Sequence, residues 1–342
     1  MVLFQKEPAD IFIGVNYVDG HLHRSLYPPD YLIIRLRIHD AGMFKRVGWN
    51  EQVGGGRWEV GGCFIPALPL PHFRILALPH FLSILRLMQS ELRSIQVTRY
   101  VIPLREGGSL PAIIEGDDGF LYVLKFRGAG QGAKALNAEL LGGELARAAG
   151  LKVPEIVFAD LDPAYGRSEP DEEIQDLLKA SAGMNLGLHF LSGSITYDPV
   201  SYNVDPILAS KIIWLDAFLT NVDRTVRNTN LLVWKNELWL IDHGAALYFH
   251  HSWENWEEQS IRPFTQIKDH VLLPFANYID EADVYMRKMI TPEIIHYATG
   301  LVPQSWLGEN ESPSVYRDFL LRRLENADIF VNQIKHAGKT SI

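Results

Sequence analysis

Three polar residues at fixed spacing constrain this chain more than any other feature of its sequence. Asp223 and Asn228 lie five residues apart in a polar stretch, 221–230, which follows a strongly apolar segment predicted to form a helix over 206–219. Asp242 lies nineteen residues after Asp223, at the far end of a short predicted hairpin. Because the hairpin brings the two parts of this pattern together, the fold must let a helix, a loop and a hairpin meet at one site.

This order and spacing is typical of the catalytic centre of a protein kinase. There, an Asn follows the base Asp by five residues, and a metal-binding Asp comes after a short hairpin. One carboxylate accepts or orients the proton of the attacking hydroxyl, while a second carboxylate and an amide oxygen hold magnesium against the phosphates of ATP. Loop capping explains the first two residues taken alone, and a turn explains the third. Their combination predicts a phosphotransfer site.

A lysine at the end of a predicted strand supports this interpretation. Antiparallel strands are predicted over 97–104, 111–115 and 120–126, joined by a glycine-containing turn and a tight hairpin turn. Lys125 lies near the end of the third strand, where a kinase lysine contacts the α- and β-phosphates of ATP. A solvated strand edge is the alternative explanation for this residue.

The helix predicted over 133–149 offers two acidic partners for Lys125. Glu139 lies fourteen residues after the lysine, and Glu144 follows five residues later on the same helix. We expect Glu139 to make the pair. For either glutamate, the alternative is a solvent-exposed helix face.

Two glycine-rich stretches are candidates for phosphate binding. Gly107, Gly108 and Ser109 lie in the turn between the first two strands, where a phosphate-covering loop belongs, and we expect them to contact ATP. The stretch 127–132 (RGAGQG) lacks the Gly-Lys-Ser/Thr of a Walker loop and the spacing of a dinucleotide fingerprint. It is either a flexible connector or a backbone cradle for phosphate.

Composition argues against several other classes of protein. A single cysteine, Cys63, excludes a disulfide within the chain and a cysteine-rich zinc site, and it fits a reducing, cytoplasmic setting. The formal net charge is -9 and no long run of Lys and Arg occurs, which argues against direct nucleic-acid binding. Because no HExxH-type pattern accompanies His243 or the pair 250–251, we expect structural or surface roles for these histidines. The tryptophans within 253–256 are expected in the core or at an interface.

The chain changes character near Met88. Residues 1–87 contain no threonine and only two serines, and neither helical nor strand periodicity persists there. This stretch is interpreted as an irregular extension or an unusual small domain, or as upstream sequence from a mis-assigned start, with translation beginning at Met88. Charged residues near the start argue against a signal peptide. The apolar stretch 63–87 is interrupted by prolines, histidines and arginine, so no membrane span is expected.

The chain resembles the HipA-like kinases, a bacterial branch of the protein-kinase-like fold. The matching pieces are the loop 223–228 (DRTVRN), the segment 241–244 (IDHG), the strand lysine, and the stretch 137–155 (NAELLGGELARAAGLKVPE). The resemblance extends from about Val97 to the C-terminus.

This resemblance implies a role for each candidate residue. Asp223 would be the base, Asn228 and Asp242 would bind magnesium, and Lys125 would contact the phosphates. In the stretch 137–155, the helix that ends before Gly150 would carry the glutamate partner of the lysine, for which Glu139 is the candidate. ATP and Mg²⁺ are therefore the expected ligands.

Three departures from the family pattern bear on the substrate and on regulation. Thr225 stands where many family loops have His, and His243-Gly244 follows the metal Asp in place of Phe-Gly. Residues 1–87 show no clear match to the N-terminal subdomain of the toxin-type members, so an antitoxin-like partner is left open. Ser109 occupies a place similar to a serine that HipA-type kinases autophosphorylate; the alternative is a turn serine that only hydrogen-bonds its own backbone.

The sequence as a whole predicts an α+β, bilobal, protein-kinase-like fold. After the extension 1–87, residues 88–190 would form a β-rich N-lobe and residues 191–342 a helical C-lobe, with ATP in the cleft between them. The predicted reaction transfers the γ-phosphate of ATP to a hydroxyl, that of a Ser or Thr of a protein. A small-molecule phosphotransferase would use the same residues. A pseudokinase that binds nucleotide or a partner is disfavoured, because the candidate residues are all intact.

Overall fold

The computed structural model divides the chain into two compact units, Met1–Leu76 and Ala77–Ile342, which are described separately. The structure describes residues 92–104, 110–168, 170–309 and 311–340, together with the backbone of five strands between residues 11 and 66. No helix among these residues is long and apolar enough to cross a membrane.

In the first unit, five strands form one antiparallel sheet in which each strand pairs with the next along the chain. They are β1 (Ile11–Gly14), β2 (Leu32–Ile38), β3 (Phe44–Asn50), β4 (Arg57–Val60) and β5 (Cys63–Pro66). The hydrophobic patterns in this stretch are too short to predict these strands. The proposed start at Met88 stays a prediction.

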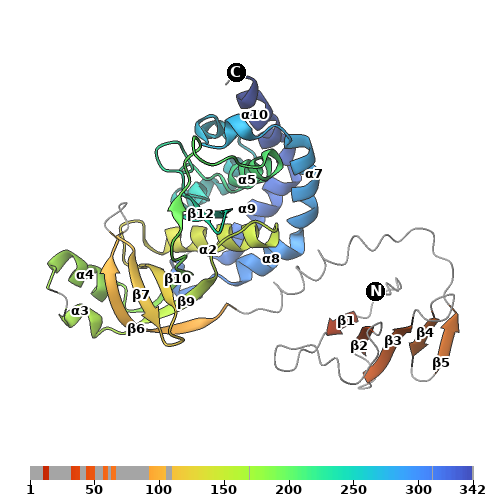
Figure 1. Cartoon of the computed structure of the whole chain (residues 1–342), viewed down its shortest axis with the longest axis horizontal. Coiled ribbons are helices and arrows are strands. Elements are labelled where there is room, and N and C mark those ends of the chain that lie inside the picture. Colours follow the sequence, from red (N-terminus) through yellow and green to blue (C-terminus); the bar gives the residue numbers. More distant parts are fainter. Residues whose placement is uncertain are drawn as a thin grey trace. The chain divides into compact units, whose positions relative to one another are not determined.

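The second unit begins with a closed five-stranded barrel, ordered β10-β8-β7-β6-β9 (Figure 1). The strands are β6 (Ser94–Pro103), β7 (Ala112–Gly116), β8 (Leu121–Lys125), β9 (Ile156–Leu161) and β10 (Gly183–His189). The predicted antiparallel order of the first three strands is confirmed. Closure depends on a parallel pairing of β6 with β9, which the sequence patterns did not indicate.

The alternation of burial along β8 decides where its lysine points. Tyr122 and Leu124 are buried in the barrel core, whereas Leu121, Val123 and Lys125 are only partly buried. Because successive side chains of a strand point to opposite faces, Lys125 points away from the barrel interior. The candidate site lies on that outer side.

Helix α2 (Gly132–Ala148) follows the barrel strands and is buried over most of its surface. It ends as predicted near Gly150, which has a φ of +76° that favours glycine. Between β9 and β10, the chain forms α3 (Tyr165–Ser168) and α4 (Glu172–Ala180). The Asp171 side chain caps α4 by accepting hydrogen bonds from the N–H groups of Glu173 and Ile174.

The remainder of the second unit is mainly helical and is built around α5 (Pro206–Leu219), which ends at Thr220 in the left-handed conformation. A three-stranded sheet, β11 (Ile195–Thr196), β12 (Leu231–Trp234) and β13 (Glu237–Leu240), flanks the polar loop that follows α5. The later helices are α6 (Trp256–Ser260), α7 (Ile279–Met289), α8 (Pro292–Gly300), α9 (Pro313–Glu325) and α10 (Ala327–Thr340). Short 3-10 helices join them: η2 (Tyr248–His251), η3 (Trp253–Asn255), η4 (Thr265–Asp269), η5 (Leu273–Phe275) and η6 (Gln304–Trp306).

Local sequence signals explain where these helices begin. Asp205, Thr291 and Ser312 each precede a proline and accept a backbone hydrogen bond within the first turn of α5, α8 and α9, respectively. The predicted bounds of α5 are confirmed. Both Trp253 and Trp256 pack against the hydrophobic core, as expected.

A buried arginine holds the end of α5 in place. Arg323 of α9 donates to the carbonyl oxygens of Ala217 and Phe218 at 2.7 and 2.8 Å, and also to those of Ser260 and Arg262. Burial lowers the pKa of Arg323 to about 9. Since the carbonyl groups at a helix C-terminus lack partners within the helix, this side chain fixes the point at which the polar loop begins.

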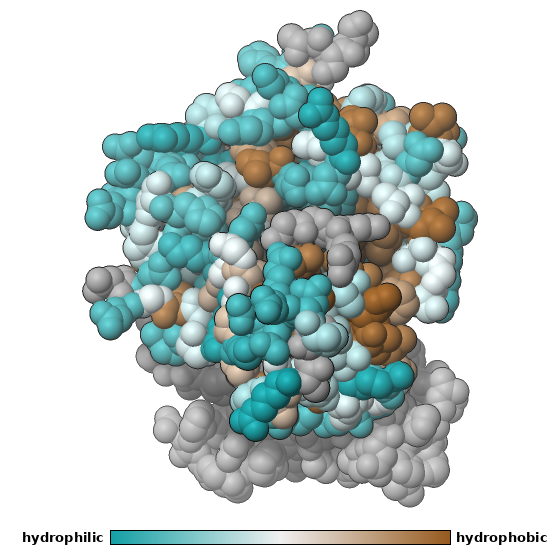
Figure 2. Space-filling model, turned by 90° about the vertical axis from the view of Figure 1, so that its left-hand side faces the viewer, coloured by the Kyte–Doolittle hydropathy of each residue, from teal (hydrophilic) through white to brown (hydrophobic). Residues whose placement is uncertain are grey.

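The molecular face in Figure 2 is mostly hydrophilic and carries separate hydrophobic patches.

Candidate active site

Lys125 joins two carboxylates that come from distant parts of the chain. Its Nζ lies 2.7 Å from Oε2 of Glu139 on α2 and 2.6 Å from Oδ1 of Asp242, which follows β13. Of the two glutamates considered as partners for the lysine, Glu144 instead pairs with Arg147 at 2.8 Å. The structure therefore brings Lys125, Glu139 and Asp242 together in one cluster.

Charge within this cluster outweighs the cost of burial. Burial alone would raise the pKa of Glu139, but the Lys125 charge and a hydrogen bond from His243 lower it to about 2. Burial alone would lower the pKa of Lys125, but Asp242 and Glu139 raise it above its ordinary value. Glu139 and Lys125 therefore both remain charged at neutral pH.

Asp223 lies in the loop after α5, within a network of amide side chains. Its Oδ2 accepts hydrogen bonds from Nδ2 of Asn228 at 2.7 Å and from Nδ2 of Asn230 at 3.3 Å. Its backbone N–H donates to Oδ1 of Asn221 at 3.3 Å. These contacts orient the carboxylate and leave its other oxygen, Oδ1, available for a substrate group. Of these three asparagines, only Asn228 belongs to the sequence motif.

A buried ion pair anchors the loop that carries Asp223 to α5. The fully buried Asp216 of α5 accepts from Arg224 Nε at 2.6 Å and from Asn221 Nδ2 at 2.8 Å, and it lies 3.0 Å from Nε2 of His270. Since His270 Nδ1 accepts from the N–H of Leu272, the Nε2 of this histidine is the donor to Asp216. Burial would raise the pKa of Asp216, but Arg224 and His270 lower it well below its usual range.

A model of the HipA-like kinase family matches residues 97–331. The chain belongs to this family. Among solved structures, it is similar to the Helicobacter pylori proinflammatory kinase CtkA at 14% identity, with a TM-score of 0.44 and coverage of 73% of this chain and 100% of that chain. The Golgi casein kinase with Mn and ADP bound is 11% identical, with a TM-score of 0.40 and coverage of 77% and 78%. No curated protein matches the chain.

The donor set of this HipA-like kinase fits a magnesium ion held jointly with phosphates. Asp242 supplies a carboxylate that is 45% exposed, and the exposed Asn228 uses its amide nitrogen to bond Asp223, which leaves its oxygen as a ligand. Magnesium is commonly bound by only one or two carboxylates together with substrate phosphates and waters. In the part of the chain that the structure describes, no cluster of three or more His, Cys, Asp or Glu side chains could form an all-protein metal site.

His243 and His250 have structural surroundings. His243 is fully buried against α2, and its backbone N–H donates to Glu139 Oε2 at 2.7 Å. His250 is buried with its Nδ1 3.2 Å from the hydroxyl of Tyr316, and burial lowers its pKa to about 3. These surroundings agree with the structural roles expected for these two residues.

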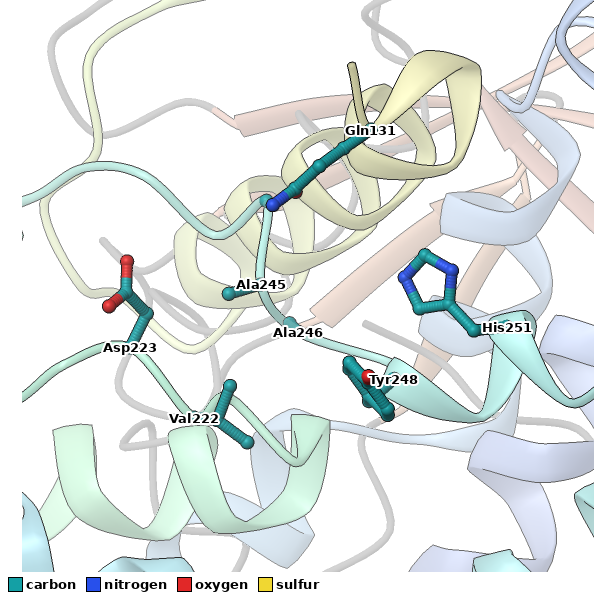
Figure 3. A pocket seen from close by; sticks show the side chains of 8 residues that line it. Gln131, Val222, Asp223, Ala245, Ala246, Tyr248 and His251 are labelled. Atoms are coloured by element: carbon teal, nitrogen blue, oxygen red, sulfur yellow. The ribbon is translucent and has the colours of Figure 1, made fainter. Parts of the chain in front are cut away.

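A pocket of about 290 Å³ opens beside the candidate base (Figure 3). It is lined by residues from the start of α2, from the loop after α5 and from the segment after Asp242, namely Gln131, Val222, Asp223, Gly244, Ala245, Ala246, Tyr248 and His251. Of these residues, only Asp223 has a catalytic role predicted from the sequence. No sequence motif marks Tyr248, because its place in the pocket depends on the fold.

Of the two glycine-rich stretches, the structure describes only 127–132. Gly107, Gly108 and Ser109 lie outside the described residues, so their predicted contact with ATP stays a prediction. In the second stretch, Gly128 donates its N–H to Oγ of Ser181 at 3.0 Å, and an added Cβ would lie 2.6 Å from Ala180. This end of the stretch is therefore a connector packed against the end of α4.

Proposed function

We propose that this HipA-like kinase transfers the γ-phosphoryl group of ATP to a Ser or Thr hydroxyl of a protein, with Mg²⁺ as the metal. The observation that carries the proposal is the convergence of Lys125, Glu139 and Asp242 at hydrogen-bond distance, from a strand, a helix and the end of a hairpin. Kinases require a strand lysine paired with a helix glutamate, and a metal-binding Asp near it. The family membership supports the same reaction.

Each residue receives a role from its position. Lys125 would bind the α- and β-phosphates, with Glu139 holding its ammonium group in place. Asp242 and Asn228 would hold Mg²⁺, which when bound neutralises phosphate charge. Asp223, whose Oδ2 is held by two amides, would orient the acceptor hydroxyl at Oδ1 and take its proton.

The transfer is balanced in atoms and charge. A bond forms between the acceptor Oγ and the γ-phosphorus, and the bond from that phosphorus to the β–γ bridging oxygen breaks, so that ADP leaves. The hydroxyl proton passes to Asp223. The chain contributes mainly positioning and charge, as is usual for this chemistry.

The pocket supports a protein acceptor over a small-molecule one. An acidic pocket sized for an amino alcohol or a sugar would favour a small-molecule phosphotransferase, but Asp223 is the one acidic residue among those that line this pocket. A cytoplasmic setting and an antitoxin-like partner stay predictions.

The test is ATP turnover by the purified full chain with Mg²⁺, with and without a mixture of Ser- and Thr-containing peptides. We expect phosphopeptide formation that is lost in Asp242→Asn. Turnover that is indifferent to both Mg²⁺ and Asp242→Asn would overturn the proposal. Phosphorylation of small alcohols but of no peptide would instead support the small-molecule enzyme.

A further inference from the structure

The pocket beside Asp223 has an aromatic wall that phosphoryl transfer itself does not require. Tyr248 opens helix η2 and is 60% exposed, and its ring centroid lies 4.9 Å from that of His251. Leu247, directly before it, donates its N–H to the carbonyl oxygen of Leu219 at 2.7 Å. This bond ties the backbone that carries the ring to the end of α5, so the start of η2 has a defined position beside the site.

Between the aromatic wall and the base, the pocket is lined by small or apolar residues and by the uncharged amide of Gln131. Figure 3 shows Asp223 at one end, Tyr248 and His251 at the other, and Ala245 and Ala246 between them. The volume of about 290 Å³ equals roughly ten waters, and it lies just below the range of about 300–1,000 Å³ for small-molecule sites. This space suits one large side chain in addition to the acceptor hydroxyl.

The charges around the pocket disfavour an anionic occupant. Asp223 lies in its lining, and the nearby Lys134 is already paired with Glu311 at 2.9 Å. Burial and the Lys134 charge lower the pKa of His251, so its ring is neutral at pH 7. An acidic side chain would therefore meet a carboxylate without gaining a free cation from these residues, whereas an uncharged ring could pack against the face of Tyr248.

We propose that this pocket is the acceptor subsite and that it takes an aromatic or large aliphatic side chain close in sequence to the phosphorylated Ser or Thr. Tyr248 is the residue that determines this preference. The inference rests on the proposed function, because it needs a protein hydroxyl as the acceptor.

The test uses the full chain, labelled ATP with Mg²⁺, and a peptide library with a fixed Ser and each neighbouring position varied in turn. We expect wild type to favour aromatic and large aliphatic neighbours over Asp and Glu. With the best peptide as probe, Tyr248→Ala should raise the peptide KM about 3- to 10-fold, which is the usual contribution of an aromatic pair. The KM for ATP should change less than about twofold, and Tyr248→Phe, which keeps the ring, should behave as wild type.

A matched control is Tyr278→Ala, which removes a tyrosine that is 44% exposed and lies outside the pocket. Unchanged peptide preference and KM in Tyr248→Ala, or a wild-type preference for acidic neighbours, would overturn the inference and leave the kinase assignment standing. If wild type hydrolyses ATP but phosphorylates no peptide of the library, both the protein acceptor and this inference are wrong.

Discussion

Replacement of Arg224 by methionine should strongly destabilise the second unit. The guanidinium group is fully buried and donates to the Asp216 carboxylate at 2.6 Å, to the carbonyl oxygen of Ile241 at 3.3 Å, and to that of Asn230. Arg224→Met fills much of the same volume but leaves a buried carboxylate without its cation. Removing one partner of a buried ion pair typically costs about 3–5 kcal/mol, a large part of the roughly 5–15 kcal/mol by which a protein is stable.

The assay is urea unfolding at pH 7, followed by tryptophan fluorescence. The matched control is Arg227→Met, which removes an exposed arginine from the same loop and should change the free energy of unfolding by less than about 0.5 kcal/mol. The double variant Asp216→Asn/Arg224→Met should be more stable than Arg224→Met alone, because it removes the unpaired charge. A loss below about 1 kcal/mol in Arg224→Met, or no recovery in the double variant, would refute this reasoning.

Five further outcomes are expected. Asp242→Asn should weaken Mg²⁺-dependent ATP binding and abolish turnover. Asp223→Asn should keep ATP binding but lower the transfer rate by about 10²- to 10⁴-fold. Nucleotide titration together with turnover measurements checks both. Lys125→Ala should weaken ATP binding and lower the rate together, in the same two measurements. Ionised Glu139 should contribute its full stabilisation above about pH 5, and this contribution should be lost as the pH falls toward the folded pKa of about 2. Between pH 7 and pH 3, the free energy of unfolding should therefore fall less steeply in Glu139→Gln than in wild type. A chain that begins at Met88 should stay in solution and melt cooperatively, and aggregation of that chain alone would contradict the prediction.

Much of the second unit could be predicted because its signals are local. The apolar run that predicts β8 also places Lys125 near the end of the strand, and Asp205 with Pro206 marks the start of α5 within the sequence itself. The pairing of Lys125 with Glu139 was predictable because strand and helix follow one another closely in the chain. Such features depend on a few neighbouring residues, so the sequence patterns report them well.

The unpredicted features depend on contacts between distant segments. His270 reaches Asp216 across 54 residues, from a segment of 3-10 turns without a hydrophobic period. The parallel pairing that closes the barrel joins Ser94 to Phe158, and no turn or spacing in the sequence signals such a contact. The aromatic wall of the pocket was missed for the same reason, since Tyr248 becomes informative only once its distance from the candidate base is set by the fold.

Helix α2 couples the parts of the site that would hold the nucleotide. Oε2 of Glu139 accepts from both the ammonium group of Lys125 and the backbone N–H of His243, the residue directly after Asp242. One turn further along α2, a Cβ added to Gly142 would lie 2.7 Å from the Cβ of His243, so only glycine allows this close approach. Since both contacts lie on one rigid, buried helix, a displacement of α2 would move the partner of the lysine and the segment that carries Asp242 together. Asp223, by contrast, is held by α5 through Asp216 and Arg224, so the acceptor side of the site has its own support.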